Sequence, residues 1–143
     1  MLVYLDICCF NRPFDDQFQN KVYLETEAKL FIQQRLKKKE IDLAWSYILD
    51  YENTANPDSD VSASIGKWEN IAKIKIIESE FILKYARDLV KMGIGVKDSL
   101  HIACAVEAKS DFFITVDKGI LNKRKFIKEV RIVSPTEFIE MEV

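Results

Sequence analysis

The stretch "VKDSLHIACAVEAKSDFFITVDKGIL" (residues 96–121) decides the fold. It holds an aspartate, Asp98, then an apolar run with helical spacing, then a short apolar run over 112–116 and a second aspartate, Asp117. An apolar helix that leads directly into a buried strand is typical of α/β proteins. We therefore expect a helix over 98–109 and a strand over 112–116, with an acid at the edge of each.

The rest of the chain repeats this alternation of strands and helices. The sequence predicts strands over 2–6, 41–46 and 130–134, and helices over 17–39 (with or without a break near Thr26), 47–55 and 79–92. It also predicts a capped helix start from Asp58, a short helical turn over 118–124, a closing turn over 135–140, and either strand or helix over 73–77. Residues 7–16 are expected to form a loop, because Asn11, Arg12 and Pro13 interrupt any regular pattern. The pattern predicts a three-layer α/β/α fold with a mainly parallel central sheet.

Composition narrows the class of protein. The length of 143 residues fits one domain over 1–143, and the net charge of −2 argues against a broadly basic nucleic-acid coat. The three cysteines form neither a disulfide framework nor a zinc pattern, so we expect reduced, buried thiols. Every apolar run is far shorter than the roughly 20 residues of a membrane span, and we expect a cytoplasmic protein that does not associate with membranes.

Three aspartates occupy sequence positions that predict a common location at one edge of a parallel sheet. Asp6 ends the first predicted strand, Asp117 follows the strand over 112–116, and Asp98 opens the helix that leads into that strand. Ligands of parallel sheets bind outside the carboxyl ends of the strands, where the strand order reverses. Asp42 and Asp111 lie at the beginnings of their strands, so we expect them at the opposite edge.

A fourth acid is expected from the segment "SYILDYEN" (residues 46–53), where Asp50 and Glu52 are two residues apart. They cannot both point to the same centre from one helix. Glu52 is favoured because it shares a helix face with Ile48 and Ala55, and Asp50 is the alternative. Glu107 projects from the far side of its helix relative to Asp98, so we expect it in solvent.

Several carboxylates in one cleft raise one another's pKa and need a cation to remain ionised. Carboxylate oxygens without cysteine or histidine ligands favour Mg²⁺ or Mn²⁺, which can activate water for phosphodiester hydrolysis. Each acid also has a purely structural interpretation. Asp98 and Asp117 are suitable helix N-caps, and Asp6 is a suitable first residue of a polar loop.

Four segments carry a resemblance to a known family. The blocks "YLDICCFNRPFDD" (4–16), "SYILDYEN" (46–53), "KDSLHIACAV" (97–106) and "FFITVDKGIL" (112–121) resemble the successive acidic blocks of PIN-domain ribonucleases along nearly the whole chain. The resemblance implies a PIN-like fold and a Mg²⁺ or Mn²⁺ site that hydrolyses RNA. It implies as metal-binding and catalytic residues Asp6, Glu52, Asp98 and Asp117.

Further residues and partners follow from the same resemblance. Thr115 matches a hydroxyl that is often found two residues before the last acid, and Asn11 belongs to the first block, whereas Ile7 and Cys8 stand where many members have Ser or Thr and then Asn. The small size resembles the VapC-like toxins of bacterial toxin–antitoxin pairs. That type implies an RNA substrate, an antitoxin protein as partner and a homodimer, for which exposed aromatic residues in 45–51 are the expected interface.

His101 and two cations are the remaining candidates. His101 lies three residues after Asp98 on nearly the same helix face. In one interpretation it holds Asp98 or a water molecule. We favour the other, in which it packs at the sheet edge as a hydrogen-bonded partner. A single histidine disfavours a Ser/His/Asp triad. Arg12 and Lys118 are candidate contacts to substrate phosphates, with solvated surface positions as the alternative.

Other functional classes fit less well. A phosphoacceptor receiver domain needs paired acids after the first strand, and haloacid-type phosphohydrolases need a second acid at position 8, where this chain has Cys8. The serious alternative is a PIN-like module that binds RNA or protein without cutting. The departures at Ile7 and Cys8 favour that alternative, and the four acids favour the metal-dependent endoribonuclease.

Overall fold

The computed structural model describes residues 1–142. The strands are β1 (Leu2–Leu5), β2 (Asp42–Ser46), β3 (Ile74–Ile76), β4 (Phe112–Ile114) and β5 (Arg131–Val133). The α-helices are α1 (Ile7–Asn11), α2 (Asn20–Lys37), α3 (Tyr47–Thr54), α4 (Ser59–Gly66), α5 (Glu80–Lys91), α6 (Val96–Glu107), α7 (Lys118–Leu121) and α8 (Pro135–Glu142), and the 3-10 helices are η1 (Arg12–Phe14), η2 (Lys67–Ile71) and η3 (Arg124–Phe126).

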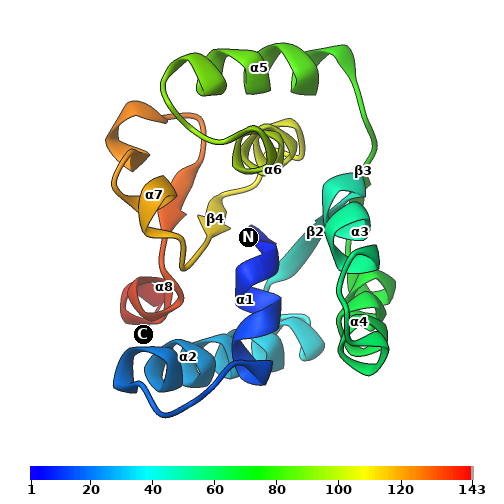
Figure 1. The fold of residues 1–143 in the computed structure, drawn as a ribbon, viewed down its shortest axis with the longest axis vertical. Coiled ribbons are helices and arrows are strands. Elements are labelled where there is room, and N and C mark those ends of the chain that lie inside the picture. The colour runs from blue at the N-terminus through cyan, green and yellow to red at the C-terminus, as the bar shows by residue number, and fades with distance from the viewer. Residues whose placement is uncertain (143) are drawn as a thin grey trace.

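The five strands form one sheet in the order β3-β2-β1-β4-β5, and every neighbouring pair is parallel. In the register, Tyr4 of β1 lies opposite Ala44 of β2 and Phe113 of β4. Figure 1 shows α5 and α6 on one side of the sheet and α1, α2 and α8 on the other. The predicted three-layer α/β/α fold is confirmed. The direction of strand addition reverses between β1 and β4, so the edge beyond these strands is the expected ligand site.

Short polar side chains cap the starts of helices α3 and α4. Ser46 accepts a hydrogen bond from the backbone N–H of Leu49 and starts α3 directly after β2, as predicted. Asp58 accepts from the N–H groups of Asp60 and Val61 at the start of α4. Such caps satisfy amide groups that have no partner inside the helix. They set the positions at which the chain turns back along the sheet.

The prediction of a loop over residues 7–16 is wrong. The chain forms α1 and then η1, and Asp6 caps α1 by accepting from the N–H of Ile7. Cys9 and Phe10 are completely buried, so tertiary packing stabilises this short helix. Pro13 lies in the first turn of η1, where a proline needs no amide partner.

Several boundaries also differ from the prediction. Helix α2 covers 20–37 without a break at Thr26, whose hydroxyl donates to the carbonyl of Arg12 at 3.1 Å. Helix α6 begins at Val96, so Asp98 lies inside its first turn, and the N-cap is Gly95. The open segment 73–77 contains the strand β3, residues 135–140 belong to α8 rather than to a turn, and β4 ends at Ile114, two residues earlier than predicted.

A buried core holds the central strands. Its largest completely buried aromatic side chains are those of Trp45, Tyr4, Phe10, Phe113 and Phe138. The rings of Tyr4 and Phe113 stack across β1 and β4 with their centroids 5.4 Å apart. Close packing of this kind leaves the carboxyl ends of β1 and β4 little freedom to move.

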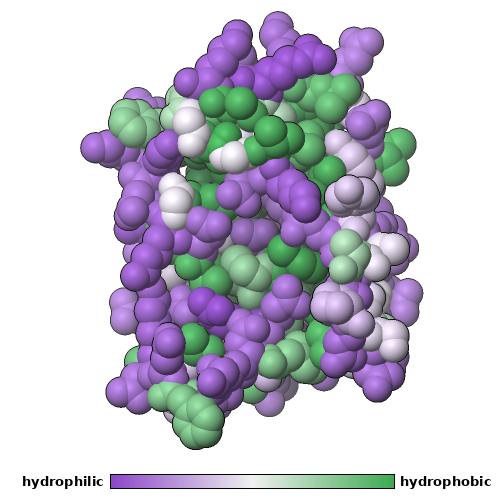
Figure 2. All heavy atoms as spheres, viewed as in Figure 1, coloured by the Kyte–Doolittle hydropathy of each residue, from purple (hydrophilic) through white to green (hydrophobic). Residues whose placement is uncertain are grey.

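Two smaller expectations concern the cysteines and membrane-spanning segments. All three cysteines are free thiols, with Cys9 and Cys104 buried and Cys8 partly buried. None of the helices in residues 1–142 is long and apolar enough to cross a membrane. Apolar side chains instead gather on part of the surface over α5 and α6 (Figure 2), where Phe81, Val90 and Val96 are exposed.

Candidate acidic site

The acids sort to the two edges of the sheet as their positions in the strands predict. Asp6 follows β1 and is buried, and Asp117 is the N-cap of α7 just beyond β4. Asp98 lies partly buried in the first turn of α6, near enough to Asp6 and Asp117 for their charges to act on it. At the opposite edge Asp111 accepts from the backbone N–H of Leu2 at 2.8 Å. Glu107 is exposed, as expected.

Both oxygens of Asp6 are held in place. Oδ1 accepts from the N–H of Ile7 at 2.8 Å, and Oδ2 accepts from the hydroxyl of Thr115 at 2.8 Å and from the thiol of Cys8 at 3.4 Å. The Thr115 oxygen in turn accepts from the backbone N–H of Asp117 at 3.1 Å. Thr115 therefore orients the Asp6 carboxylate and the chain at Asp117. From its position directly after β4 it supplies a hydroxyl that Ile7 and Cys8 cannot offer after β1.

The structure places Glu52, and not Asp50, toward this edge. Glu52 Oε1 lies 2.5 Å from Nε2 of His101, and the same nitrogen is 3.8 Å from Oδ1 of Asp6. Asp50 is exposed and accepts from the indole N–H of Trp45 at 2.9 Å. His101 thus connects Asp6 and Glu52, rather than holding Asp98 directly.

A buried chain of hydrogen bonds stands behind His101. The Tyr4 hydroxyl lies 2.6 Å from Nδ1 of His101 and 2.6 Å from the hydroxyl of Ser46. An ionised Glu52 can only accept, so Nε2–H donates to it; in the neutral imidazole Nδ1 then accepts from the Tyr4 hydroxyl, and that hydroxyl can accept from Ser46. Burial and the nearby Cys104 raise the pKa of Tyr4 well above its usual value, so Tyr4 stays a donor. Ser46 and Tyr4 carry no sequence signal for this role.

The surroundings of Asp98 change the pKa of its carboxyl group. Its burial, followed by the charges of Asp6 and Asp117, raises the pKa of its carboxyl from 3.8 to about 6, and His101 opposes this shift. A carboxylate whose ionisation is disfavoured by its neighbours is a frequent feature of functional sites. Besides burial, the charges of Asp6, Asp117 and Glu52 act on Asp98, so acids from four segments of the chain lie near enough to influence this carboxyl.

This shift predicts how the metal-free protein responds to pH. The folded pKa of about 6 lies above the ordinary value of 3.8, so Asp98 contributes stability below about pH 4 that is lost as the pH rises through 6. Partial exposure to solvent makes the effect smaller than the full shift would give. We expect the unfolding free energy in chelator to fall between pH 4 and 6.5 by more in wild type than in Asp98→Asn, measured by urea denaturation. Equal slopes of unfolding free energy against pH in the two proteins would contradict a raised pKa for Asp98.

The carboxylate oxygens of the site are ligands of the kind that a hard divalent cation such as Mg²⁺ prefers. In the part of the chain that the structure describes, no three His, Cys, Asp or Glu side chains are close enough to hold a metal ion together. Mg²⁺ is commonly held by one or two carboxylates and keeps several waters, so a site of this kind does not require three protein ligands. A hydrogen bond with Cys9 and burial raise the pKa of the Cys8 thiol well above its usual value, which disfavours a thiolate ligand.

The predicted phosphate contacts differ in their surroundings. Arg12 forms ion pairs with Asp15 at 2.8 Å and with Glu25 at 3.2 Å, which hold it against α2 and away from free contact with a ligand. Lys118 is exposed at the start of α7, directly after Asp117. Of the two, Lys118 is the better placed for a phosphate near the acids.

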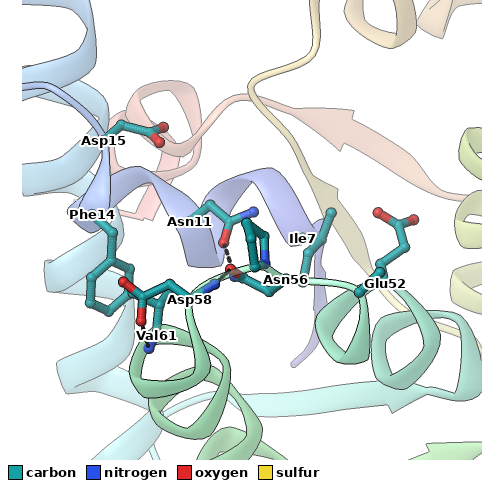
Figure 3. A pocket seen from close by; sticks show the side chains of 10 residues that line it. Ile7, Asn11, Phe14, Asp15, Glu52, Asn56, Asp58 and Val61 are labelled. Carbon is teal, nitrogen blue, oxygen red and sulfur yellow. Dashed lines mark hydrogen bonds between the residues drawn. The ribbon is translucent and has the colours of Figure 1, made fainter.

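A pocket continues from the acids toward α4. It has a volume of about 380 Å³, and Glu52 belongs to its wall together with Ile7, Asn11, Phe14, Asp15, Ala55, Asn56, Pro57, Asp58 and Val61. Figure 3 shows Glu52 at one end and Phe14, Asp58 and Val61 at the other. Apart from Asn11 and Glu52, these residues were not predicted to belong to a site. The only signals were the Asn56-Pro57 breaker and the capping aspartate Asp58.

The fold and the acidic edge together define an α/β/α protein with an acid-lined site at the switch between β1 and β4. Two solved structures have a similar fold, and each is 17% identical in sequence. VapBC2 from Rickettsia felis, bound to a DNA fragment from its promoter, matches over 94% of this chain and 98% of its own chain with a TM-score of 0.57. VapBC-1 from nontypeable Haemophilus influenzae matches over 95% and 99% with a TM-score of 0.59.

The chain therefore has a VapC-like PIN-domain fold, as its sequence predicts. No family model matches the sequence. No curated protein matches it either. At this level of identity the similarity establishes the fold, and the chemistry has to be argued from the site.

Proposed function

We propose that this protein is a metal-dependent endoribonuclease that hydrolyses RNA phosphodiester bonds. The observation that carries the proposal is the position of Asp98, whose pKa is raised by burial and by the charges of Asp6 and Asp117. These acids come from the residue after β1, from α6 and from the segment after β4, and a structural role for each alone does not explain why they share one edge. A divalent cation would compensate the charge they accumulate.

The chain's own residues have distinct roles in this proposal. Asp6 and Asp98 would hold Mg²⁺ or Mn²⁺, with Glu52 and Asp117 completing the acidic surround, and the bound ion would supply an activated water and neutralise charge on the phosphate. Thr115 keeps Asp6 in a fixed rotamer. His101 holds Glu52. Lys118 is available to a non-scissile phosphate.

The direct test compares wild type with Asp98→Asn. Incubated with end-labelled single-stranded RNA and Mn²⁺, wild type is expected to produce internal cleavage products that chelator abolishes. Asp98→Asn is expected to lose nearly all of this activity because it removes a ligand charge. Glu107→Gln is the matched control, since this exposed acid lies on the same helix and far from the site. Wild type and Asp98→Asn behaving alike with Mn²⁺ and with chelator would refute the nuclease.

Two partners belong to this proposal. Both similar structures are of VapBC proteins, and the sequence resembles toxins of toxin–antitoxin pairs, so we propose an antitoxin protein as the inhibitor of this chain. We also propose a homodimer. Of the aromatic residues in 45–51, Trp45 is buried, Tyr47 is partly buried and Tyr51 is exposed, so Tyr51 is the best placed for the interface suggested by the sequence.

Two observations favour the alternative of a PIN-like module that binds RNA or protein without cutting. The hydrogen bond from His101 engages an oxygen of Glu52, and among residues 1–142 no three metal-ligating side chains converge. In that case RNA or partner binding would be unchanged by chelator and by Asp98→Asn. The cleavage experiment separates the two functions.

A further inference from the structure

We propose that the pocket beside Glu52 seats the nucleobase adjacent to the phosphate at the acidic site, and that it favours guanine. The inference rests on the proposed function in taking RNA as the ligand. Glu52 belongs to both the acidic site and the pocket wall, so the two are continuous (Figure 3). The volume of about 380 Å³ is within the range of sites that hold small ligands, which are roughly 300 Å³ or larger.

The charges in the pocket argue against a phosphate as its occupant. Its wall, as described for residues 1–142, contains the three carboxylates of Asp15, Glu52 and Asp58 and neither lysine nor arginine. A phosphate would be repelled there. The uncharged part of a nucleotide, with amino groups that carboxylates can accept from, fits the same wall.

One hydrogen-bond donor in the pocket has a fixed orientation. The backbone N–H of Asp58 donates to Oδ1 of Asn56 at 3.0 Å, which fixes the Asn56 side chain with its amide nitrogen toward Asn11. That nitrogen then makes a long contact of 3.5 Å to Oδ1 of Asn11. The amide nitrogen of Asn11 is thereby the group left to donate to a ligand.

The acceptors complement this donor. Asp58 uses Oδ1 to cap α4, and Asp15 uses Oδ2 to pair with Arg12, so each retains its other oxygen. Guanine presents an acceptor, O6, beside two donors, N1–H and the 2-amino group, on one edge. Asn11 can donate to O6 while a carboxylate accepts from N1–H and the amino group. Phe14, which is 52% exposed, offers a ring face on which a base can stack.

An arginine side chain from a protein partner is the competing occupant. A guanidinium has only donors, so it cannot accept from the amide nitrogen of Asn11. A base uses the donor, the acceptors and the aromatic face together, so the pocket suits a base better.

The test measures binding in chelator, where no cleavage occurs. Fluorescein-labelled RNA pentamers with a central guanosine, inosine or uridine are titrated with protein and followed by anisotropy. Inosine keeps O6 and N1–H but lacks the 2-amino group. We expect wild type to bind the guanosine pentamer about tenfold more tightly than the other two, since a bidentate contact to a base is typically worth that much discrimination.

Three variants locate the effect. Asp58→Asn keeps a good helix cap but removes the carboxylate, so it is expected to bind guanosine and inosine pentamers equally. Asn11→Asp removes the donor and is expected to weaken guanosine binding about tenfold. Asp60→Asn is the matched control, because this acid lies in the first turn of the same helix and outside the pocket. Circular dichroism melting verifies that each variant is folded.

The outcomes separate this inference from the nuclease proposal. Equal binding of the three pentamers, or variants that bind like wild type, would overturn the base pocket even if Mn²⁺-dependent cleavage occurs. Guanosine-selective binding that depends on Asp58 would support the pocket even if no cleavage is found. Binding of a triarginine peptide that Asp58→Asn weakens, without selectivity among the pentamers, would assign the pocket to a protein partner and overturn the inference.

Discussion

Replacing Asp6 with asparagine is expected to lower Mn²⁺-dependent RNA cleavage by more than about a hundredfold. Groups that only orient a metal ligand are worth roughly 10- to 100-fold, and Asp6 is proposed as the ligand itself. The fold should survive, because asparagine keeps an oxygen to accept from the N–H of Ile7 and a nitrogen that can donate to the Thr115 hydroxyl. Initial rates of cleavage of a labelled RNA measure the effect, and thermal unfolding verifies the fold.

The matched control for this substitution is Asp111→Asn. Asp111 also lies beside a central strand, but at the opposite edge, where it accepts from the backbone N–H of Leu2. Asparagine preserves that hydrogen bond, so both activity and stability should stay near those of wild type. A comparable loss of cleavage in the two variants would mean that charge or stability in general, and not the site, governs the activity.

Replacing His101 with alanine is expected to affect stability and activity together. The side chain is 1% exposed, and its loss leaves Tyr4 and Glu52 without their partner and opens a cavity. We expect the unfolding free energy to fall by about 2–4 kcal/mol. Cleavage should fall roughly 10- to 100-fold, because His101 acts on the site through Glu52. Urea denaturation and cleavage rates over a range of Mn²⁺ concentrations measure both effects.

A positioning role for His101 makes a narrower prediction than a structural one. His101→Gln retains an N–H that can reach Glu52, so it should recover much of the cleavage rate and the Mn²⁺ dependence without recovering all of the stability. Tyr4→Phe keeps the ring stack on Phe113 but loses the hydroxyl behind the imidazole, so its effect on cleavage should be smaller. If the cleavage rates of the three variants simply follow their unfolding free energies, His101 has only a structural role in the core.

Features that depend on neighbours along the chain were predictable. Apolar runs bounded by polar residues indicated the strands, and Ser46 indicated the start of α3, because strand and cap signals are local. The position of an acid at the start or the end of a strand separated Asp6 from Asp111. Since all strands are parallel, that local position also decided which edge each acid occupies.

Errors arose where distant packing outweighs local preference. Asn11 and Pro13 are breakers in isolation, yet the preceding residues form α1 because Phe10 and Cys9 are buried and Asp6 caps the helix. Helix α6 begins at Val96, two residues before Asp98, because its N-cap is Gly95. The position of the aspartate in the sequence does not indicate this earlier start. Local preferences of this kind amount to less than about 1 kcal/mol per residue, which the burial of one large side chain exceeds.

The sequence by itself determined the α/β alternation, the set of candidate acids and the edge at which Asp6, Asp98 and Asp117 lie. The tertiary structure decided which side chains meet: Glu52 with His101 across 49 residues, and Asp6 with Thr115 across 109. It also created the pocket between α1 and α4. The physical reason is that a strand or a cap depends on a few adjacent residues, whereas the partner of a buried polar group depends on how β1 packs between β2 and β4.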